Sequence, residues 1–296
     1  WMTMFTLTDG QVTVAVSSHG AELCSIKRNE VEYLWQADPA FWKRHSPVLF
    51  PIVGSLWNGT FRYCGREYGM SQHGFARDRE FELISQSDNE IMFALDSDDA
   101  SREVYPFDFR LEIGYRLEQR KIKVLWTVKN NGNDRMFYQI GAHPAFYFPD
   151  FDVEAEKNGY FSFGKKGEPV SDLEYLLIKE KGCADVEKKH RIHLEKGLMP
   201  VAVNTFDDDA LIVENSQVDK VVLHTPAGKL WLALSFDAPL VGLWSPPAKN
   251  APFVCIEPWY GRCDRAGFEG EISERDWIQS LASGESFSCC YTIELY

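Results

Sequence analysis

Three short segments of this 296-residue chain join a titratable side chain to glycine, proline or aromatic residues. They are Gln72–Arg77 (QHGFAR), Gly141–Phe146 (GAHPAF) and Ile256–Gly261 (IEPWYG). Each segment is typical of an irregular turn at a strand end, where a rigid sheet fixes the position of an exposed side chain. Their central residues, His73, His143 and Glu257, are of the types that act as general acids and bases.

Each of these residues also has a structural interpretation. A histidine that precedes glycine or proline is more often a hydrogen-bonded turn residue than a catalyst, and this applies to His73 and His143. Glu257 follows the apolar run Pro252–Ile256 and precedes a proline and two aromatic residues. This context predicts a buried carboxylate that needs a partner. A structural salt bridge would satisfy Glu257 as well as a catalytic role would.

Aromatic residues make up 14% of the chain, and several lie in or near the three segments. These are Phe75, Phe146, Trp244, Trp259 and Tyr260. The C–H faces of sugars stack on aromatic rings, while sugar hydroxyls bind carboxylate, imidazole and amide groups. A cleft of this composition suits a neutral polyol. Since sandwich cores are also rich in aromatic residues, any single tryptophan can be structural.

Alternating apolar and polar residues predict the strands that position these segments. The alternation is clear in Gln11–Val16, Lys121–Val128, Leu230–Phe236 and the C-terminal ESFSCCYTIELY. Frequent turn residues separate such runs, which favours an all-β fold, a large antiparallel β-sandwich. Adjacent Cys289 and Cys290 should point to opposite faces.

Helical signals are few, and residues 2–296 are interpreted as one domain. Short helices are predicted from Asp38 to Arg44 and, after a capping box that begins at Ser273, from Trp277 to Leu281. Trp1 precedes Met2 and is interpreted as lying outside the fold.

Charge and composition exclude several classes of partner. The 31 basic and 44 acidic residues give a net charge of -13, so we expect neither nucleic acid nor a membrane surface as a partner. No apolar run approaches the roughly 20 residues of a membrane-spanning helix, which favours a cytoplasmic protein. The seven cysteines are odd in number and form no C-x-x-C pair, which argues against a disulfide framework and a zinc ribbon.

The three segments, in this order, resemble the aldose 1-epimerase (mutarotase) family. The runs Ser46–Gly54, Leu243–Ser245 and Cys255–Gly261 are similar to its LacX-type branch. The resemblance implies a galactose mutarotase-like supersandwich and an isomerase without cofactor or metal. Its partner would be a small-molecule sugar, an aldohexose or a close relative. We expect a monomer or a homodimer.

By the family pattern, His143 is the general acid that protonates the ring oxygen, and Glu257 is the base that takes the anomeric hydroxyl proton. His73 would hydrogen-bond the sugar near the ring oxygen or C6. The chemistry agrees with this pattern, because opening a hemiacetal requires one proton removed from the C1 hydroxyl and another delivered to the ring oxygen. We expect acid and base to face each other across the sugar.

Further residues are predicted to bind substrate. Asp209, in an acidic turn, would contact sugar hydroxyls, although such a turn can simply be solvated. Arg77 would bind substrate or brace a carboxylate, and Trp244 and Trp259 would line the cleft. Ser55 stands where galactose-type members carry an arginine, which puts specificity for galactose or glucose in doubt. Arg44 or Arg77 could replace that arginine, or the cleft could accept a modified sugar.

Other functions remain open from the residues. The chain lacks G-x-G-x-x-G, P-loop and G-x-S-x-G motifs, and the pair His190 and His193 has no zinc-site frame. A non-catalytic sugar-binding or sensing protein would keep the cleft without turnover. A sugar-phosphate mutarotase would need a cationic cluster, for which Arg44, Arg62 and Arg77 are candidates. A glycosidase using Asp209 and Glu257 ranks low.

Overall fold

Antiparallel strands form most of the regular structure in the computed structural model, which describes residues 3–296. Trp1 and Met2, and the interpretation placed on Trp1, lie outside the described residues. The longest helix of the described chain, α1 (Asp99–Val104), has six residues. Within residues 3–296, no helix has the length and apolar character needed to cross a membrane. The all-β prediction is confirmed.

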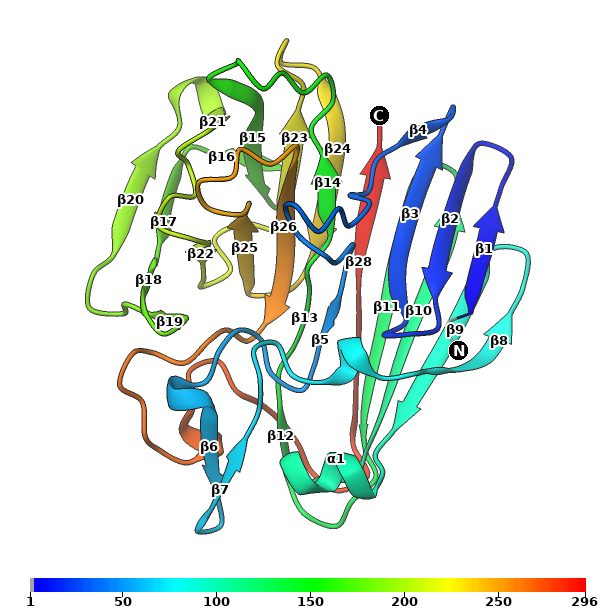
Figure 1. The fold of residues 1–296 in the computed structure, drawn as a ribbon, viewed down its shortest axis with the longest axis vertical. Helices are drawn as coiled ribbons and strands as arrows, with labels where there is room; N and C mark the ends of the chain where they lie inside the picture. The colour runs from blue at the N-terminus through cyan, green and yellow to red at the C-terminus, as the bar shows by residue number, and fades with distance from the viewer. Residues whose placement is uncertain (1–2) are drawn as a thin grey trace.

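The largest sheet has ten strands and forms the back of the molecule in Figure 1. In spatial order it contains β16 (Glu168–Val170), β15 (Lys157–Lys165), β23 (Lys220–His224), β24 (Leu230–Phe236), β28 (Ser286–Leu295), β11 (Lys121–Asn130), β10 (Phe109–Glu118), β9 (Glu90–Asp96) and β8 (Glu82–Gln86), with β21 (Met199–Ala202) paired to β15.

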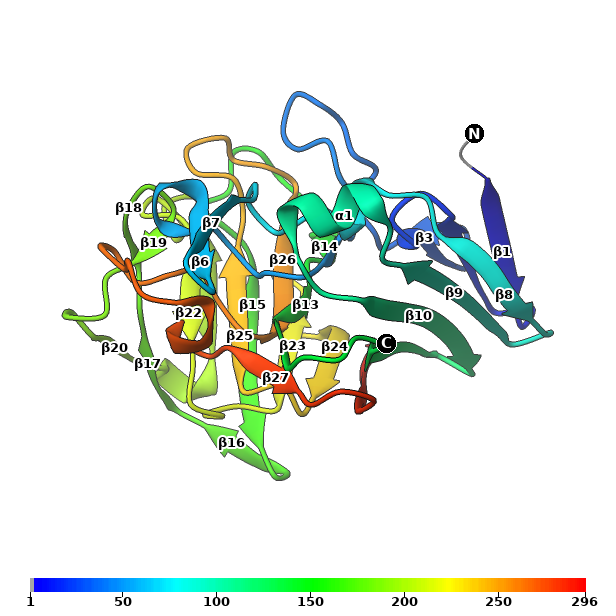
Figure 2. The same ribbon diagram turned by 90° about the horizontal axis from the view of Figure 1, so that it is seen from below.

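Two smaller sheets cover this large sheet, so the predicted sandwich is confirmed (Figures 1 and 2). The first contains β1 (Met4–Thr8), β2 (Val12–Ser17), β3 (Glu22–Arg28) and β4 (Val31–Glu32). The second contains β22 (Leu211–Val213), β25 (Leu240–Trp244), β26 (Phe253–Tyr260), β13 (Ile140–Ala142) and β5 (Val48–Leu49) in this order, with β14 (Ala145–Tyr147) also paired to β26.

Short hairpins and turns complete the described chain. The two-stranded pairs are β6 (Thr60–Tyr63) with β7 (Arg66–Gly69), β12 (Met136–Tyr138) with β27 (Gln279–Leu281), β17 (Asp172–Tyr175) with β20 (His190–His193), and β18 (Ile178–Glu180) with β19 (Cys183–Ala184). The 3-10 turns are η1 (Trp57–Gly59), η2 (Ala76–Asp78), η3 (Glu195–Gly197) and η4 (Ile272–Glu274).

The core lies between the layers, and strand alternation explains it. In β28, Tyr291, Ile293 and Leu295 are buried, whereas Cys290 on the opposite face is exposed. All seven cysteines of the described chain are free thiols, and adjacent Cys289 and Cys290 lie on opposite faces of β28. The interpretation of residues 2–296 as a single domain stays a prediction.

Both predicted helices are wrong. At Asp38 the chain makes one turn, in which the Asp38 carbonyl accepts from the N–H groups of Phe41 and Trp42. The aromatic rings that follow then pack onto the sheet instead of continuing a helix. After Ser273, the 3-10 turn η4 ends at once. Trp277 has a left-handed φ of 61°, and the segment beyond it enters β27, where pairing with β12 outweighs the capping signal.

Candidate active site

Strand β26 lies inside the second sheet and carries Glu257 at an interruption in its pairing. β14 pairs with Phe253–Cys255, and β13 pairs with Trp259 and Tyr260, so the turn between β13 and β14 faces Glu257. His143 lies in that turn. Pro258 lacks an N–H to donate, which suits a place where a neighbouring strand breaks off. The sequence GAHPAF therefore delivers an imidazole to the carboxylate of IEPWYG.

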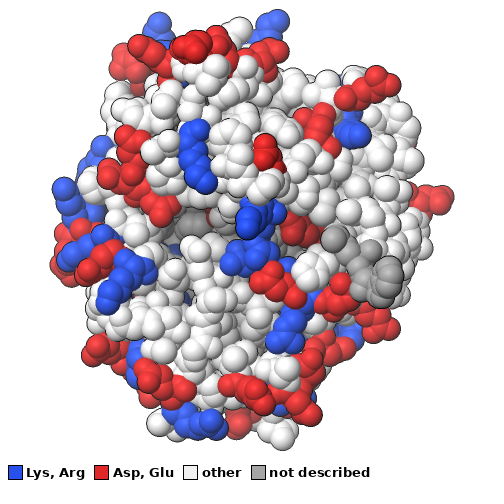
Figure 3. All heavy atoms as spheres, in the orientation of Figure 1, with Lys and Arg blue, Asp and Glu red and all other residues white. Residues whose placement is uncertain are grey.

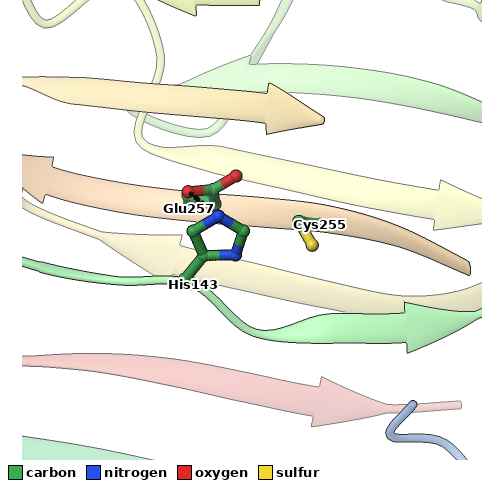
Figure 4. Close-up of side chains that lie close together, drawn as sticks. All are labelled: His143, Cys255 and Glu257. Atoms are coloured by element: carbon green, nitrogen blue, oxygen red, sulfur yellow. Dashed lines mark ion pairs between the residues drawn. The ribbon is translucent and has the colours of Figure 1, made fainter. Parts of the chain in front are cut away.

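His143 and Glu257 are in direct contact. The His143 Nε2 atom lies 3.2 Å from Glu257 Oε1, and the two side chains are 8% and 2% exposed. Figure 4 shows the imidazole pointing from its turn toward the carboxylate on β26. Among the described residues, neither Glu257 Oε1 nor His143 Nδ1 has a well-formed hydrogen bond. Buried polar atoms without partners are rare, and beside a cavity they are available to a ligand.

The surroundings disfavour charge on both groups. Burial raises the pKa of Glu257 well above its usual range, the negative charge of Asp209 raises this pKa further, and the indole N–H of Trp259 partly opposes the rise. Burial lowers the pKa of His143 to about 3, and the positive charges of Arg77 and Arg44 contribute. Titratable groups with such opposed shifts in one cavity are characteristic of acid–base sites.

His73 reaches the same site from the loop after β7, and its backbone is held in place by Gly54. The His73 N–H donates to the Gly54 carbonyl at 2.9 Å, and the Gly54 N–H donates to His73 Nδ1 at 2.9 Å. Burial lowers the pKa of His73 well below its usual range. Because Nδ1 accepts a hydrogen bond, the neutral ring carries its proton on Nε2, which makes His73 a donor toward a ligand.

The glycine after His73 is a steric requirement. Gly74 has a φ of 73°, and a Cβ atom there would lie 2.3 Å from the Phe50 carbonyl oxygen. That carbonyl accepts the N–H groups of Phe75 and Ala76, so it cannot move away cheaply. The HGFA turn therefore needs glycine to bring His73 within 5.4 Å of His143, measured between ring centroids.

A cavity of about 310 Å³ opens beside these residues. Seven of the eight predicted site residues line it, namely His73, Arg77, His143, Asp209, Trp244, Glu257 and Trp259. This volume lies within the range of small-molecule sites. Figure 3 shows a hollow on this face with basic side chains next to it.

Ser55 is the predicted residue that the structure places outside the lining. A Cβ on the lining residue Gly182 would lie 2.5 Å from Ser55 Oγ, so Ser55 stands behind Gly182. Its carbonyl accepts the N–H of Asp264. Trp259 closes one side of the cavity and offers little ring face for stacking, because its indole packs between Gly141 and Gly242. A Cβ atom at these two glycines would lie within 2.6 and 2.3 Å of the ring.

Trp42 is a site residue that sequence reasoning missed. It lines the cavity, and its ring lies 4.7 Å from the His143 ring at an angle of 30°. The Trp35 indole donates to the Trp42 carbonyl at 2.8 Å and fixes this loop. Gln72 also lines the cavity. Gln72 lies inside the QHGFAR segment, whereas Trp42 carried no signal beyond its position in a segment interpreted as a helix.

We expect Trp42→Ala to raise KM about five- to tenfold, because it removes an aromatic face worth roughly 1 kcal/mol to a stacked ligand and to His143. Trp231→Ala is a matched control. Trp231 is also half-buried and stacked, with its ring 4.6 Å from that of Tyr33, but it does not line the cavity. Steady-state kinetics of both variants test this, and an equal KM in both would contradict it.

Cys255 is a third titratable group at the pair. One ligand-type atom each from His143, Cys255 and Glu257 lie within 4.8 Å of one another (Figure 4). The thiol shares the Glu257 face of β26 but does not line the cavity. Its pKa is raised well above the ordinary value, by burial and by Glu257, which favours the thiol over the thiolate that binds metals. That the site uses no metal stays a prediction.

Comparison with known proteins agrees with this geometry. The family model described as aldose 1-epimerase matches residues 3–291. The plasmid-encoded protein LacX of Lactococcus lactis subsp. lactis is 32% identical over 267 residues, which cover 86% of this chain and 87% of LacX.

Two solved structures are also similar over almost their whole length. A galactose mutarotase related enzyme from Lactobacillus acidophilus has a TM-score of 0.91 at 32% identity, covering 99% of this chain and 97% of that one. A galactose mutarotase-like protein from Lactobacillus casei has a TM-score of 0.91 at 27% identity, covering 99% and 100%.

Proposed function

The chain belongs to the aldose 1-epimerase family, enzymes that isomerise sugars, and on this basis we propose that it interconverts the α and β anomers of an aldohexose or a close relative. His143 and Glu257 serve as the acid–base pair. The observation that carries the proposal is the contact of 3.2 Å between these two side chains at the wall of the cavity.

The reaction suits two groups that stand side by side. In ring opening, the base takes the proton of the C1 hydroxyl, a C1=O double bond forms, the bond from C1 to the ring oxygen breaks, and the acid protonates that oxygen. Both oxygens are bonded to C1, so an adjacent acid and base reach them together. From the sequence we expected acid and base to face each other across the sugar, and the contact between them favours this closer arrangement.

The pair needs one transferable proton in total. With that proton, Glu257 and His143 can be a carboxylic acid with a neutral imidazole, or a carboxylate with an imidazolium. Burial favours the uncharged arrangement in the empty cavity. At 3.2 Å the two groups need only a small reorientation to form a hydrogen bond, along which the proton moves to His143 when a sugar binds, without uptake from water. After the C1 group rotates by half a turn, the ring closes with the roles reversed.

His73 positions the sugar while the catalytic pair transfers protons to and from it. Its Nε2–H donates to an oxygen near the ring, while Asp209 accepts from another hydroxyl. Trp42 and Trp244 offer aromatic faces for stacking. Charge-assisted and neutral hydrogen bonds from fixed groups orient C1 against the catalytic pair.

We expect a bell-shaped dependence of kcat/KM on pH, because the pair must hold one proton. On the acidic side, activity is lost as pH falls through the lowered His143 pKa of about 3, where a second proton binds. On the alkaline side, activity is lost as pH rises through the raised Glu257 pKa, well above 4.5, where the shared proton leaves.

Exchange between the anomeric protons, followed by NMR and corrected for the uncatalysed rate, measures this profile at equilibrium. The proposal predicts exchange that the protein accelerates and that declines above the Glu257 pKa. Exchange at the uncatalysed rate in a sugar solution that saturates the protein would contradict the proposed function.

A further inference from the structure

Arg77 presents an unsatisfied guanidinium to the cavity. It lines the cavity, and its Nη2 donates to the Gln72 carbonyl at 2.9 Å. Its Nε is buried and has no hydrogen-bond partner among residues 3–296. No carboxylate of the described chain forms an ion pair with it, although the neighbouring Asp78 pairs with Arg44 at 3.0 Å. A guanidinium that has no carboxylate partner and leaves a buried donor unused gains from an anionic ligand.

Positive charge gathers on this side of the cavity. Burial and the charge of Arg44 together lower the pKa of Arg77 to about 10, although Asp78 and Glu22 oppose the change. Both arginines also lower the pKa of His73 and of His143. Figure 3 shows basic side chains beside the hollow.

The two carboxylates whose charges act on Arg77, Asp78 and Glu22, are already engaged. Asp78 pairs with Arg44, and Glu22 accepts the backbone N–H groups of His45 and Ser46 at 2.8 and 3.1 Å. Asp78 and Glu22 thus offset the positive charge only in part, because neither contacts the Arg77 guanidinium.

We propose that the cavity takes a sugar with an anionic substituent, a phosphate or a carboxylate, which Arg77 binds beside Arg44. This inference rests on the proposed function, since that function places C1 at His143 and Glu257. The substituent then belongs on a carbon remote from C1, and C6 is the natural choice in an aldohexose. A guanidinium can donate to two oxygens of either group.

Arg62 has no part in this site. Its Nε donates to the Gly270 carbonyl at 2.9 Å, its Nη1 lies 3.6 Å from Glu67, and it does not line the cavity. Of the three arginines considered from the sequence, the geometry thus retains Arg77, with Arg44 as its neighbour.

Calorimetric titration with D-glucose, D-glucose 6-phosphate and D-glucuronate tests the inference. We expect the wild type to bind at least one anionic sugar about tenfold or more tightly than glucose, the usual strength of a buried charge-assisted hydrogen bond. The sugar that is preferred identifies phosphate or carboxylate. Arg77→Gln should remove the preference, measured as the ratio of the affinities.

Arg79→Gln is the matched control. Arg79 lies two residues further on, pairs with Asp98 and covers the Phe75 ring, but it does not line the cavity. It should keep the preference. Equal affinity of the wild type for all three sugars, or a preference that survives Arg77→Gln, would overturn the inference.

The anomeric exchange rate separates this inference from the proposed function. An Arg77-dependent preference without accelerated exchange would support the anion site and contradict the mutarotase. Accelerated exchange of glucose without any preference for an anionic sugar would support the mutarotase and contradict the anion site.

Discussion

Glu257→Gln is expected to lower the turnover number by about 10²–10⁴-fold, the usual contribution of one proton-transfer group. Glutamine has nearly the same shape and is neutral, like the buried acid that the raised pKa favours. It leaves the cavity filled but cannot take a proton from the C1 hydroxyl. Sugar affinity should change far less than turnover, which calorimetry on the same variant measures.

Glu112→Gln supplies the control for this change. Glu112 is a carboxylate that is 15% exposed on β10, where it pairs with Arg110 at 3.1 Å, outside the cavity lining. Its amide variant should retain wild-type turnover. A Glu257→Gln enzyme that keeps more than about a tenth of wild-type turnover would rule out Glu257 as the base.

His143→Asn should cause a loss of similar size, about 10²–10⁴-fold, because it removes the group that exchanges the shared proton with Glu257. The double variant Glu257→Gln/His143→Asn provides the sharper test. Residues that act as one unit have strongly non-additive effects. We therefore expect the double variant to be about as slow as either single variant.

His224→Asn is the control for the histidine. His224 is also mostly buried, and burial lowers its pKa, but it bonds Ser162 Oγ at 2.7 Å on the large sheet and does not line the cavity. The expected turnover is that of the wild type. If the losses of the two single site variants multiply in the double variant, the two groups act independently and the shared-proton account is wrong.

The sequence allowed the sandwich and most of the polar lining of the cavity to be predicted, because both depend on local patterns. Leu230–Phe236 alternates and forms β24 with these bounds. The QHGFAR, GAHPAF and IEPWYG segments could be identified because glycine and proline beside a titratable residue mark strand ends. All three reach one cavity, as the family resemblance implied.

What depends on long-range packing could not be predicted. The side-by-side arrangement of His143 and Glu257 requires that β14 leave β26 where β13 joins it, a register that no local pattern encodes. Trp42 reaches His143 because its loop is tied to Trp35, and the same tertiary contacts override the helix signal at Asp38. Ser55 lies behind Gly182 because two loops that are distant in the sequence approach each other closely, which is also a long-range contact.

The central claim is that His143 and Glu257 interconvert sugar anomers, and polarimetry tests it most directly. Fresh solutions of α-D-glucose and α-D-galactose are followed near neutral pH without protein, with the wild type and with Glu257→Gln. The account predicts that the wild type speeds the decay to the equilibrium rotation of at least one sugar and that the variant does not. A sugar that binds by calorimetry but decays at the uncatalysed rate with the wild type would contradict it, and would instead favour a protein that binds sugars without converting them.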